Sequence, residues 1–367
     1  MTQDVEQRGP AWAEPAGPPD RRRRRARAAL LIALAILLVL AGAGVAGTAY
    51  LQHRVDAALE KIDDPFAALP ARPTPSAENR AEAAAEAGRA DPVNVLVLGS
   101  DSRISAGDPS AWAAGAQRTD ALMVAQLAGT REHAYVMSIP RDAWVDVPGH
   151  GMNKINAAFS FGGPTLLIQT VEQLTGIPID HFAVADFESF VALTDELGGV
   201  EMKLRSPLEA GGETLGPGEH RLTGEQALAY VRERYDLPRG DFDRVQRQQY
   251  WMRRMLQQAD REGKLANPLA VADLLTVVSR GVSVDEGFTV AEMRNLLLSM
   301  RDLRIENVQY LTAPYTGTGR SPDGQSIVLL NEGLFRGLAE AFATDTVGEY
   351  LRSHDGAVET LGWSVPD

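Results

Sequence analysis

The run Asn94-Val-Leu-Val-Leu-Gly99 decides the fold class. Its centre is wholly apolar and it ends in a glycine, which is typical of a short strand buried on both faces. The segments Ala121–Leu127 and Ala134–Pro140 have the same character. Because helices must cover both faces of a sheet built from such strands, the sequence predicts an α/β fold.

Helical patterns alternate with these strands. Thr223 followed three residues later by Gln226 predicts a capping box and a helix that runs to Tyr230. Further helices are predicted at 164–174, 188–197 and 243–262, after Thr289 and at Asn331, and further strands at 182–187, 305–312 and 326–330. The pattern predicts a single α/β sandwich with mixed connections.

An uncharged segment near the N-terminus is long enough to cross a membrane. Residues 28–51 contain LLIALAILLVL at their centre, and a run of arginines precedes them. About 20 apolar residues suffice for a membrane-spanning helix, and basic flanks remain on the cytoplasmic side. We therefore expect a transmembrane helix with residues 1–27 in the cytoplasm and the rest of the chain outside. The alternative is a cleaved signal peptide.

Charge and composition exclude several function classes. The formal net charge is −13, and the arginine-rich head of residues 1–27 is itself positive, so the remainder is strongly acidic. This balance argues against a general nucleic-acid binder. The chain has no cysteine, which excludes a disulfide scaffold, a thiol nucleophile and an iron–sulfur cluster. Residues 52–92 hold clustered prolines and an Ala/Glu-rich piece and are predicted to be a linker, which leaves 93–367 as the folded domain.

Acidic and basic residues gather where the predicted strands begin and end. Asp101 and Arg103 follow the first strand, Arg118 and Asp120 precede the second, and Arg141 follows the third. Ligands of α/β folds bind at the carboxyl ends of strands. Two aspartates at neighbouring strand ends suit a hard divalent cation such as Mg²⁺. The alternative for each motif alone is that its aspartate caps a turn and its arginine pairs with a local acid.

A second basic group lies further along the chain. If its segment is extended, Arg232 and Arg234 share one face. Arg244 and Gln248 are four residues apart at the start of a long helix, where backbone amides favour an anion. Guanidinium groups bind phosphate oxygens in pairs. Together with the arginines at the strand ends, these residues suit a pyrophosphate, unless acidic neighbours neutralise each of them on the surface.

Six segments in order carry a resemblance to a known family: NVLVLGSDSR, RTDALMV, MSIPRDAWVDVPGHGMNKINAAFSFGG, LTGIPIDHFAVADFESFVALTDELGGVEM, HRLTGEQALAYVRER and GDFDRVQRQ. In this order they resemble the LytR-CpsA-Psr family, strongly over about residues 93–255. The resemblance implies a three-layer α/β/α sandwich with a central mixed sheet, preceded by one transmembrane helix. It also implies a cell-membrane protein whose catalytic domain, 93–367, is extracytoplasmic.

The activity that the resemblance implies is a phosphotransferase. Such enzymes move a glycopolymer from a polyprenyl-pyrophosphate carrier onto peptidoglycan and form a phosphodiester. The metal-linked aspartates fall on Asp101 and Asp120, which would hold Mg²⁺ or Mn²⁺. By motif position, the groups that bind the pyrophosphate are Arg118, Arg141, Arg232, Arg234, Arg244 and Gln248. The expected catalytic residues are Asp101, Arg103, Asp120 and Arg141.

Two departures from the family pattern and three open questions remain. Asn153 stands where the family often has an acid, and the Ala/Gly/Pro-rich segment 104–117 separates the first two motifs. Asp142 and Asp241 are both candidates for the group that accepts the hydroxyl proton. An apolar tunnel for the lipid is expected near 166–174, 187–197 and 269–278, where ordinary core packing is the alternative. A pyrophosphatase, or a non-catalytic binder of the lipid-linked polymer, is the rival function.

Overall fold

The computed structural model describes residues 60–70, 72–73, 89–100, 119–234, 237–263 and 282–362. All of them belong to one compact unit, Gln52–Asp367. Within these ranges no helix combines the length and hydrophobicity that a membrane crossing requires. The predicted head, 1–27, and transmembrane segment, 28–51, lie outside the described residues.

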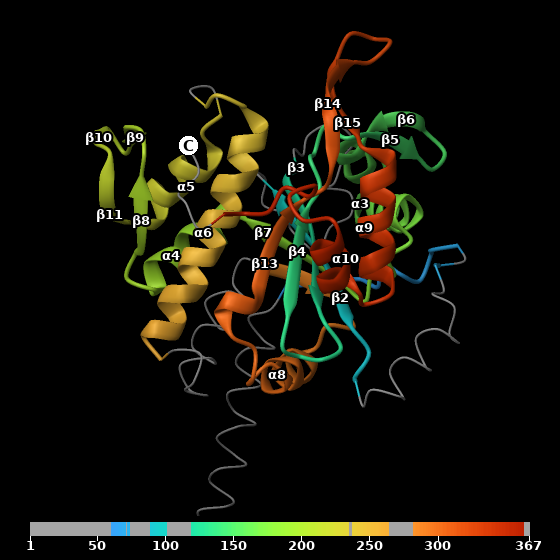
Figure 1. The fold of residues 1–367 in the computed structure, drawn as a ribbon, viewed down its shortest axis with the longest axis horizontal. Helices are drawn as coiled ribbons and strands as arrows, with labels where there is room; N and C mark the ends of the chain where they lie inside the picture. Colours follow the sequence, from blue (N-terminus) through green and yellow to red (C-terminus); the bar gives the residue numbers. More distant parts are fainter. Residues whose placement is uncertain are drawn as a thin grey trace, which may run out of the picture. The chain divides into compact units, whose positions relative to one another are not determined.

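A mixed sheet of seven strands forms the centre of this unit (Figure 1). The strand order is β1-β12-β7-β2-β3-β4-β13. Strand β3 is antiparallel to both of its neighbours, β2 and β4. Strand β2 is parallel to β7, and β4 is parallel to β13. The strands are β1 (Glu60–Ile62), β2 (Val93–Ser100), β3 (Thr119–Leu127), β4 (Ala134–Ser138), β7 (His181–Asp186), β12 (Val282–Asp285) and β13 (Val308–Thr312). The predicted α/β class and mixed sheet are confirmed.

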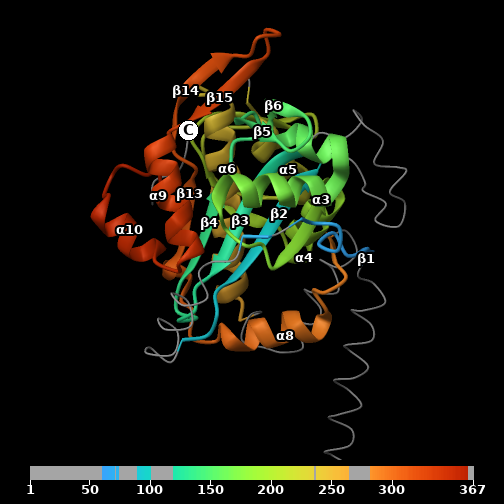
Figure 2. The same ribbon diagram turned by 90° about the vertical axis from the view of Figure 1, so that its right-hand side faces the viewer.

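Helices cover both faces of the sheet (Figures 1 and 2). On one side lie α3 (Ile155–Thr175), α9 (Glu332–Ala343) and α10 (Val347–Ser353), and on the other α4 (Phe187–Glu196), α5 (Gly224–Arg232) and α6 (Asp241–Arg261). The helix α8 (Val290–Ser299) lies at one end of the sheet and precedes a short 3₁₀ turn, Ile305–Asn307. The helices and the sheet therefore form three layers.

Four two-stranded ribbons complete the fold. They are β5 (Trp144–Val147) with β6 (Gly151–Lys154), β8 (Val200–Leu204) with β11 (Gly218–Leu222), β9 (Leu208–Ala210) with β10 (Glu213–Leu215), and β14 (Tyr315–Arg320) with β15 (Ser326–Leu330). Of these eight strands, only β15 was predicted, because most are five residues or fewer and too short to establish an alternating pattern.

Helix starts follow the sequence signals closely. Thr223 and Gln226 form the predicted capping box, and Thr289 and Asn331 each accept a hydrogen bond from a backbone N–H of the helix they begin. The start of α3 differs from the prediction. It begins at Ile155, nine residues before Pro164, because a kink at Gly162 and Gly163 places the proline at the start of the second segment.

Two large apolar cores and a smaller cluster of Ala183, Val284 and Val290 stabilise the layers. The first lies between the sheet and α3 and α9, where Leu167, Ile168 and Val171 of α3 are fully buried. The predicted tunnel wall at 166–174 thus contributes to this core, a lipid tunnel there stays a prediction, and 269–278 lies outside the described residues. The second core joins α4, α5 and α6 to β8 and β11.

Part of the predicted linker packs against the folded domain. The strand β1 pairs with β12, and Ile62 is buried in the first core. Arg72 donates to Glu172 at 2.7 Å and also to the carbonyl of Ile179. Composition alone placed the start of the folded domain near residue 93, whereas described residues between 60 and 73 already make specific contacts with this domain.

Candidate anion-binding site at the sheet edge

The candidate site residues follow or precede strands that meet at one edge of the sheet. Since β2, β4, β7 and β13 run in the same direction, all four end at the edge where the antiparallel β3 begins. Ser100, the last residue of β2, lies between Thr119 of β3 and Asp186 of β7. Asp101 and Arg103 follow Ser100 in sequence, but they and Arg118 lie outside the described residues. For Asp120 only the backbone is described, within β3.

Two of the predicted arginines meet on one carboxylate. Arg244 Nη2 lies 2.7 Å from Asp241 Oδ1, and Arg141 Nη2 lies 3.6 Å from the same oxygen. The side chain of Arg244 is 4% exposed, that of Arg141 11% and that of Asp241 24%. Two guanidinium groups thus share one carboxylate. Residues about 100 apart in sequence thus lie close together, whereas their binding of a pyrophosphate stays a prediction.

A buried glutamine fixes the helix that carries Arg244. Gln249 Nε2 donates to the hydroxyl of Ser138 at 3.0 Å and to the carbonyl of Leu311 at 2.8 Å. Ser138 is the last residue of β4, and Leu311 is the last but one of β13. These two bonds tie α6 to the carboxyl ends of both strands, so the first turns of α6 lie at the sheet edge beside Arg141.

The turn before α6 is fixed by ion pairs. Gly240, the N-cap, has φ of 56°, a conformation that glycine adopts easily. Arg239 contacts Asp243 at 2.6 Å and Glu359 at 2.7 Å. Burial lowers the pKa of Arg239, but hydrogen bonds to Glu359 and Asp243 outweigh this and raise it. The guanidinium therefore stays charged and links the start of α6 to the C-terminal segment.

Arg232 and Arg234 do not alternate along an extended strand. Arg232 is the last residue of α5, and only at Glu233 does the backbone become extended, with φ −61° and ψ 134°. The guanidinium of Arg232 lies 4.4 Å from the ring centre of Phe187. Because Phe187 directly follows β7, this contact brings Arg232 to the same edge of the sheet. The predicted shared face is wrong, although the stacking on Phe187 supports the predicted location of Arg232.

Gln248 follows Arg244 by one turn of α6. Its side-chain oxygen is buried, and among the described residues it has no hydrogen-bond partner. Such groups are uncommon in folded proteins, and a bound ligand or water is one way to satisfy them. The i, i+4 spacing puts Gln248 on the same face of the helix as Arg244.

Both carboxylates that the sequence offered as proton acceptors are ion-paired. Asp142 lies 3.0 Å from Lys154 Nζ, and Asp241 holds the two arginines described above. Lys154 directly follows Asn153, where the family pattern often has an acid. Sequence reasoning missed the pairing role of Lys154 and the bridging role of Asp241. For Asp241, the i, i+3 spacing to Arg244 was a usable signal.

The metal prediction rests on residues beyond this part of the site. Among the described residues, no cluster of three or more His, Asp or Glu side chains suits a metal ion. The backbone of Asp120 lies next to the end of β2, which Asp101 follows, so connectivity brings two oxygen donors to neighbouring positions. Carboxylate oxygens are the ligands that Mg²⁺ prefers.

The chain belongs to the LytR_cpsA_psr family, whose model matches residues 70–338. It is 32% identical to the cell wall biosynthesis protein LcpA of Corynebacterium glutamicum over 314 residues, which cover 75% of this chain and 59% of LcpA. It is 38% identical to the probable cell wall biosynthesis protein LcpB of the same organism, over 57% of this chain and 52% of LcpB. The chain thus spans between half and three-fifths of the length of these relatives.

Solved structures share the fold. TagT of B. subtilis has a TM-score of 0.54 and 26% identity, over 70% of this chain and 91% of TagT. A structure of TagT bound to LI-WTA matches with a TM-score of 0.56, at the same identity and coverage. The protein gbs0355 of Streptococcus agalactiae has a TM-score of 0.61 at 22% identity, over 72% of this chain and 90% of gbs0355, and this similarity concerns the fold alone.

Proposed function

We propose that this protein is a membrane-anchored phosphotransferase of cell wall biosynthesis. It moves a glycopolymer from a polyprenyl-pyrophosphate carrier onto peptidoglycan and forms a phosphodiester link. Family membership and the names of LcpA and LcpB support a role in the cell wall. The complex of TagT with LI-WTA supports a substrate related to wall teichoic acid, although the polymer of this protein is a separate question.

The observation that carries the proposal is the convergence of Arg141 and Arg244 on Asp241 at the sheet edge. A pyrophosphate is a compact anion with several oxygens, and guanidinium groups bind such oxygens in pairs. Both guanidinium groups are largely buried, so an anion that contacts them gains strong electrostatic stabilisation. Arg232, and by motif position Arg118 and Arg234, add further positive charge.

The proposed reaction exchanges one phosphorus–oxygen bond for another. A hydroxyl oxygen of peptidoglycan attacks the phosphorus that is linked to the glycopolymer, and a new P–O bond forms. The P–O bond to polyprenyl phosphate breaks, polyprenyl phosphate leaves, and the hydroxyl proton passes to a base. Arg141 and Arg244 stabilise the negative charge that develops on the phosphoryl oxygens. Asp241 keeps both arginines oriented before the substrate binds.

A divalent cation is part of the proposal. Asp101 and Asp120 would hold Mg²⁺ or Mn²⁺, and the cation would neutralise charge on the phosphate oxygens. In sequence, Asp101 directly follows the last residue of β2, and Asp120 belongs to the neighbouring strand β3, so we propose that their carboxylates form one donor set for a hard metal ion. Arg103 would assist at the same position.

The lipid tail and the membrane complete the arrangement. On β2, Leu96 and Leu98 face the first core, whereas Val95 and Val97 on the opposite face are only half-buried. We propose that the polyprenyl chain lies on this face of the sheet. We further propose that residues 28–51 anchor the protein in the cell membrane and that the catalytic domain is extracytoplasmic.

The test is a transfer assay with the full chain. A short polyprenyl-pyrophosphate disaccharide and Mg²⁺ are supplied with and without a peptidoglycan oligomer, and products are separated by mass spectrometry. We expect a phosphodiester-linked product that forms only with the acceptor. Phosphate release without the acceptor would identify a pyrophosphatase. Tight substrate binding without turnover, unchanged in Asp120→Ala, would identify a non-catalytic binder.

A further inference from the structure

A cavity of about 720 Å³ lies between α6 and the ribbon β8–β11, and it is lined by Glu201, Met202, Lys203, Arg205, Glu219, His220, Arg221, Tyr250, Arg254 and Arg261. Its volume is in the range of small-molecule and saccharide sites. Five of these side chains are Lys or Arg and two are Glu, a net of three positive charges on a chain of net charge −13. Like charges gathered against the overall charge indicate an anionic ligand.

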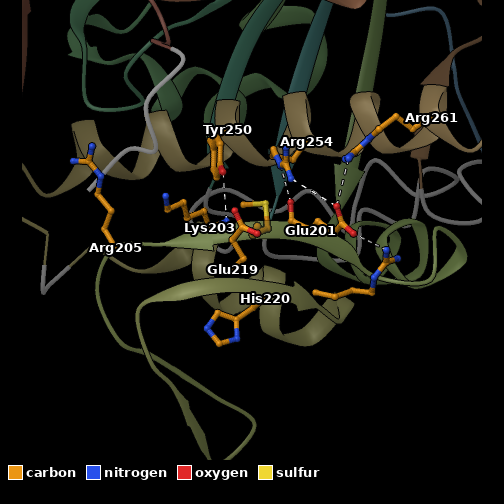
Figure 3. Close-up of a pocket in the computed structure, with 10 residues that line it drawn as sticks. Glu201, Lys203, Arg205, Glu219, His220, Tyr250, Arg254 and Arg261 are labelled. Atoms are coloured by element: carbon orange, nitrogen blue, oxygen red, sulfur yellow. Dashed lines mark hydrogen bonds and ion pairs between the residues drawn. The ribbon is translucent and has the colours of Figure 1, made fainter.

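The cavity is separate from the sheet edge. Arg254 follows Arg244 by ten residues, which corresponds to about 15 Å along a helix, and lies about three-quarters of a turn further round it. Figure 3 shows Arg254 and Arg261 reaching from α6 toward Glu201 on β8, with Lys203 and Tyr250 beside them. None of these residues takes part in the arginine cluster around Asp241.

One carboxylate organises three of the arginines. Glu201 contacts Arg221 at 3.0 Å, Arg261 at 3.5 Å and Arg254 at 4.0 Å. Arg254 also donates from Nε to the carbonyl of Glu201 at 2.7 Å, so its guanidinium is fixed in place. A single negative charge cannot neutralise three positive ones, and the arginines remain available to oxyanions from the solvent side.

Lys203 adds a fourth cation. It stands directly opposite Glu219 in the β8–β11 ladder, and its ammonium makes no ion pair with the described residues. Its backbone N–H donates to the hydroxyl of Tyr250 at 3.4 Å, which holds β8 against α6. Because Tyr250 is itself buried in the second core, this bond fixes the position of Lys203 at the cavity wall.

We infer that this cavity is a second binding site, which takes the phosphate or carboxylate groups of an acidic glycan chain. The glycan as ligand rests on the proposed function, whereas the preference for an anion rests on the cavity itself. A glycopolymer whose pyrophosphate lies at the sheet edge can reach the cavity with its first few sugar units, because the two sites are about 15 Å apart along α6.

The test measures binding by isothermal titration calorimetry with the full chain. The probes are a short oligo(glycerol phosphate), an oligogalacturonate and a neutral maltooligosaccharide of matching length. We expect at least one acidic probe to bind, with an affinity that falls as salt rises, and the neutral probe not to bind. The acidic probe that binds identifies the source of the charge as phosphate or carboxylate.

Variants assign the binding to the cavity. The double variant Lys203→Gln, Arg261→Gln should weaken binding about tenfold or more, because two charged contacts are lost. Glu219→Gln should tighten it about two- to threefold, because a repelling charge is removed. Arg301→Gln is the control, since this arginine is 82% exposed and outside the cavity.

Binding of neither acidic probe, or equal affinity in the double variant and the parent, would overturn the inference. The transfer assay with the short lipid-linked disaccharide is run in parallel. Transfer that persists without acidic-glycan binding refutes the second site and leaves the proposed function intact. Acidic-glycan binding without any transfer refutes the proposed function and leaves the second site intact.

Discussion

Replacing Asp241 with asparagine removes the carboxylate that Arg141 and Arg244 share. The contact to Arg244 is short and its arginine is buried, so it contributes about 1.5–3 kcal/mol, as hydrogen bonds to charged groups do. The longer contact to Arg141 adds less than about 1 kcal/mol. Asp241 also opens α6, where a negative charge contributes about 0.3–1 kcal/mol. We expect Asp241→Asn to lower the free energy of unfolding by about 2–5 kcal/mol.

Calorimetry of the full chain in detergent measures this effect. For a domain of this size, 1 kcal/mol corresponds to about 2–4 °C in Tm, so the variant should melt about 4–20 °C lower. Inorganic pyrophosphate at about 100 times its Kd stabilises a protein by about 2.7 kcal/mol. It should stabilise Asp241→Asn more than the parent, because the anion replaces the lost carboxylate between the two arginines.

The control is Asp302→Asn, which removes an exposed carboxylate paired with an exposed arginine. It should change the free energy of unfolding by less than about 0.5 kcal/mol. If pyrophosphate does not narrow the difference in Tm between Asp241→Asn and the parent, the anion does not replace the lost carboxylate and this prediction is wrong. A variant as stable as the parent would contradict it as well, because both results deny that the arginines depend on an anion.

Three further predictions concern catalysis and stability. In the transfer assay, Arg244→Gln should reduce the rate about 100-fold, since one stabilising group is lost, whereas the exposed Arg294→Gln should have no effect. Gly224→Ala should lower the free energy of unfolding, measured by chemical denaturation, by about 1–3 kcal/mol, because a Cβ at this position meets a backbone oxygen at 2.4 Å. Gly333→Ala is the control, since a Cβ has space there, and it should be neutral or slightly stabilising. Arg239→Ala should lower the free energy of unfolding by about 1–2 kcal/mol, a value that already allows for the partial exposure of the arginine. Equal thermal stability of the variant and the parent would show that the ion pairs of Arg239 do not stabilise the start of α6.

The parts of the fold that sequence predicted are those fixed by local chemistry. Thr223, Thr289 and Asn331 cap helices through side-chain bonds to residues three positions away, and such contacts are visible in the sequence. Five of the seven strands of the central sheet were found from their apolar runs, whereas the short strands β1 and β12 were missed. The kink at Gly162 and Gly163 was missed, because two glycines before a proline look like a helix start and give no sign of the helix that precedes them.

The candidate site was predicted only as a set of residue types. Which oxygen Arg141 contacts depends on Asp241, 100 residues away, and on Gln249, which fixes α6 on two strand ends. Neither contact has a local signature. The cavity between α6 and the β8–β11 ribbon was missed, because β8 and β11 are short and their charged residues look like an ordinary solvated surface. The aspartates assigned to a metal ion remain a prediction from motif position.

The most direct test is the structure of the full chain bound to a polyprenyl-pyrophosphate disaccharide. We expect both phosphorus atoms at the sheet edge, with phosphate oxygens within hydrogen-bonding distance of Arg141 and Arg244. We also expect the sugars to extend outward from that edge. A pyrophosphate bound only in the cavity beside Glu201, or bound with no contact to either arginine, would contradict the account.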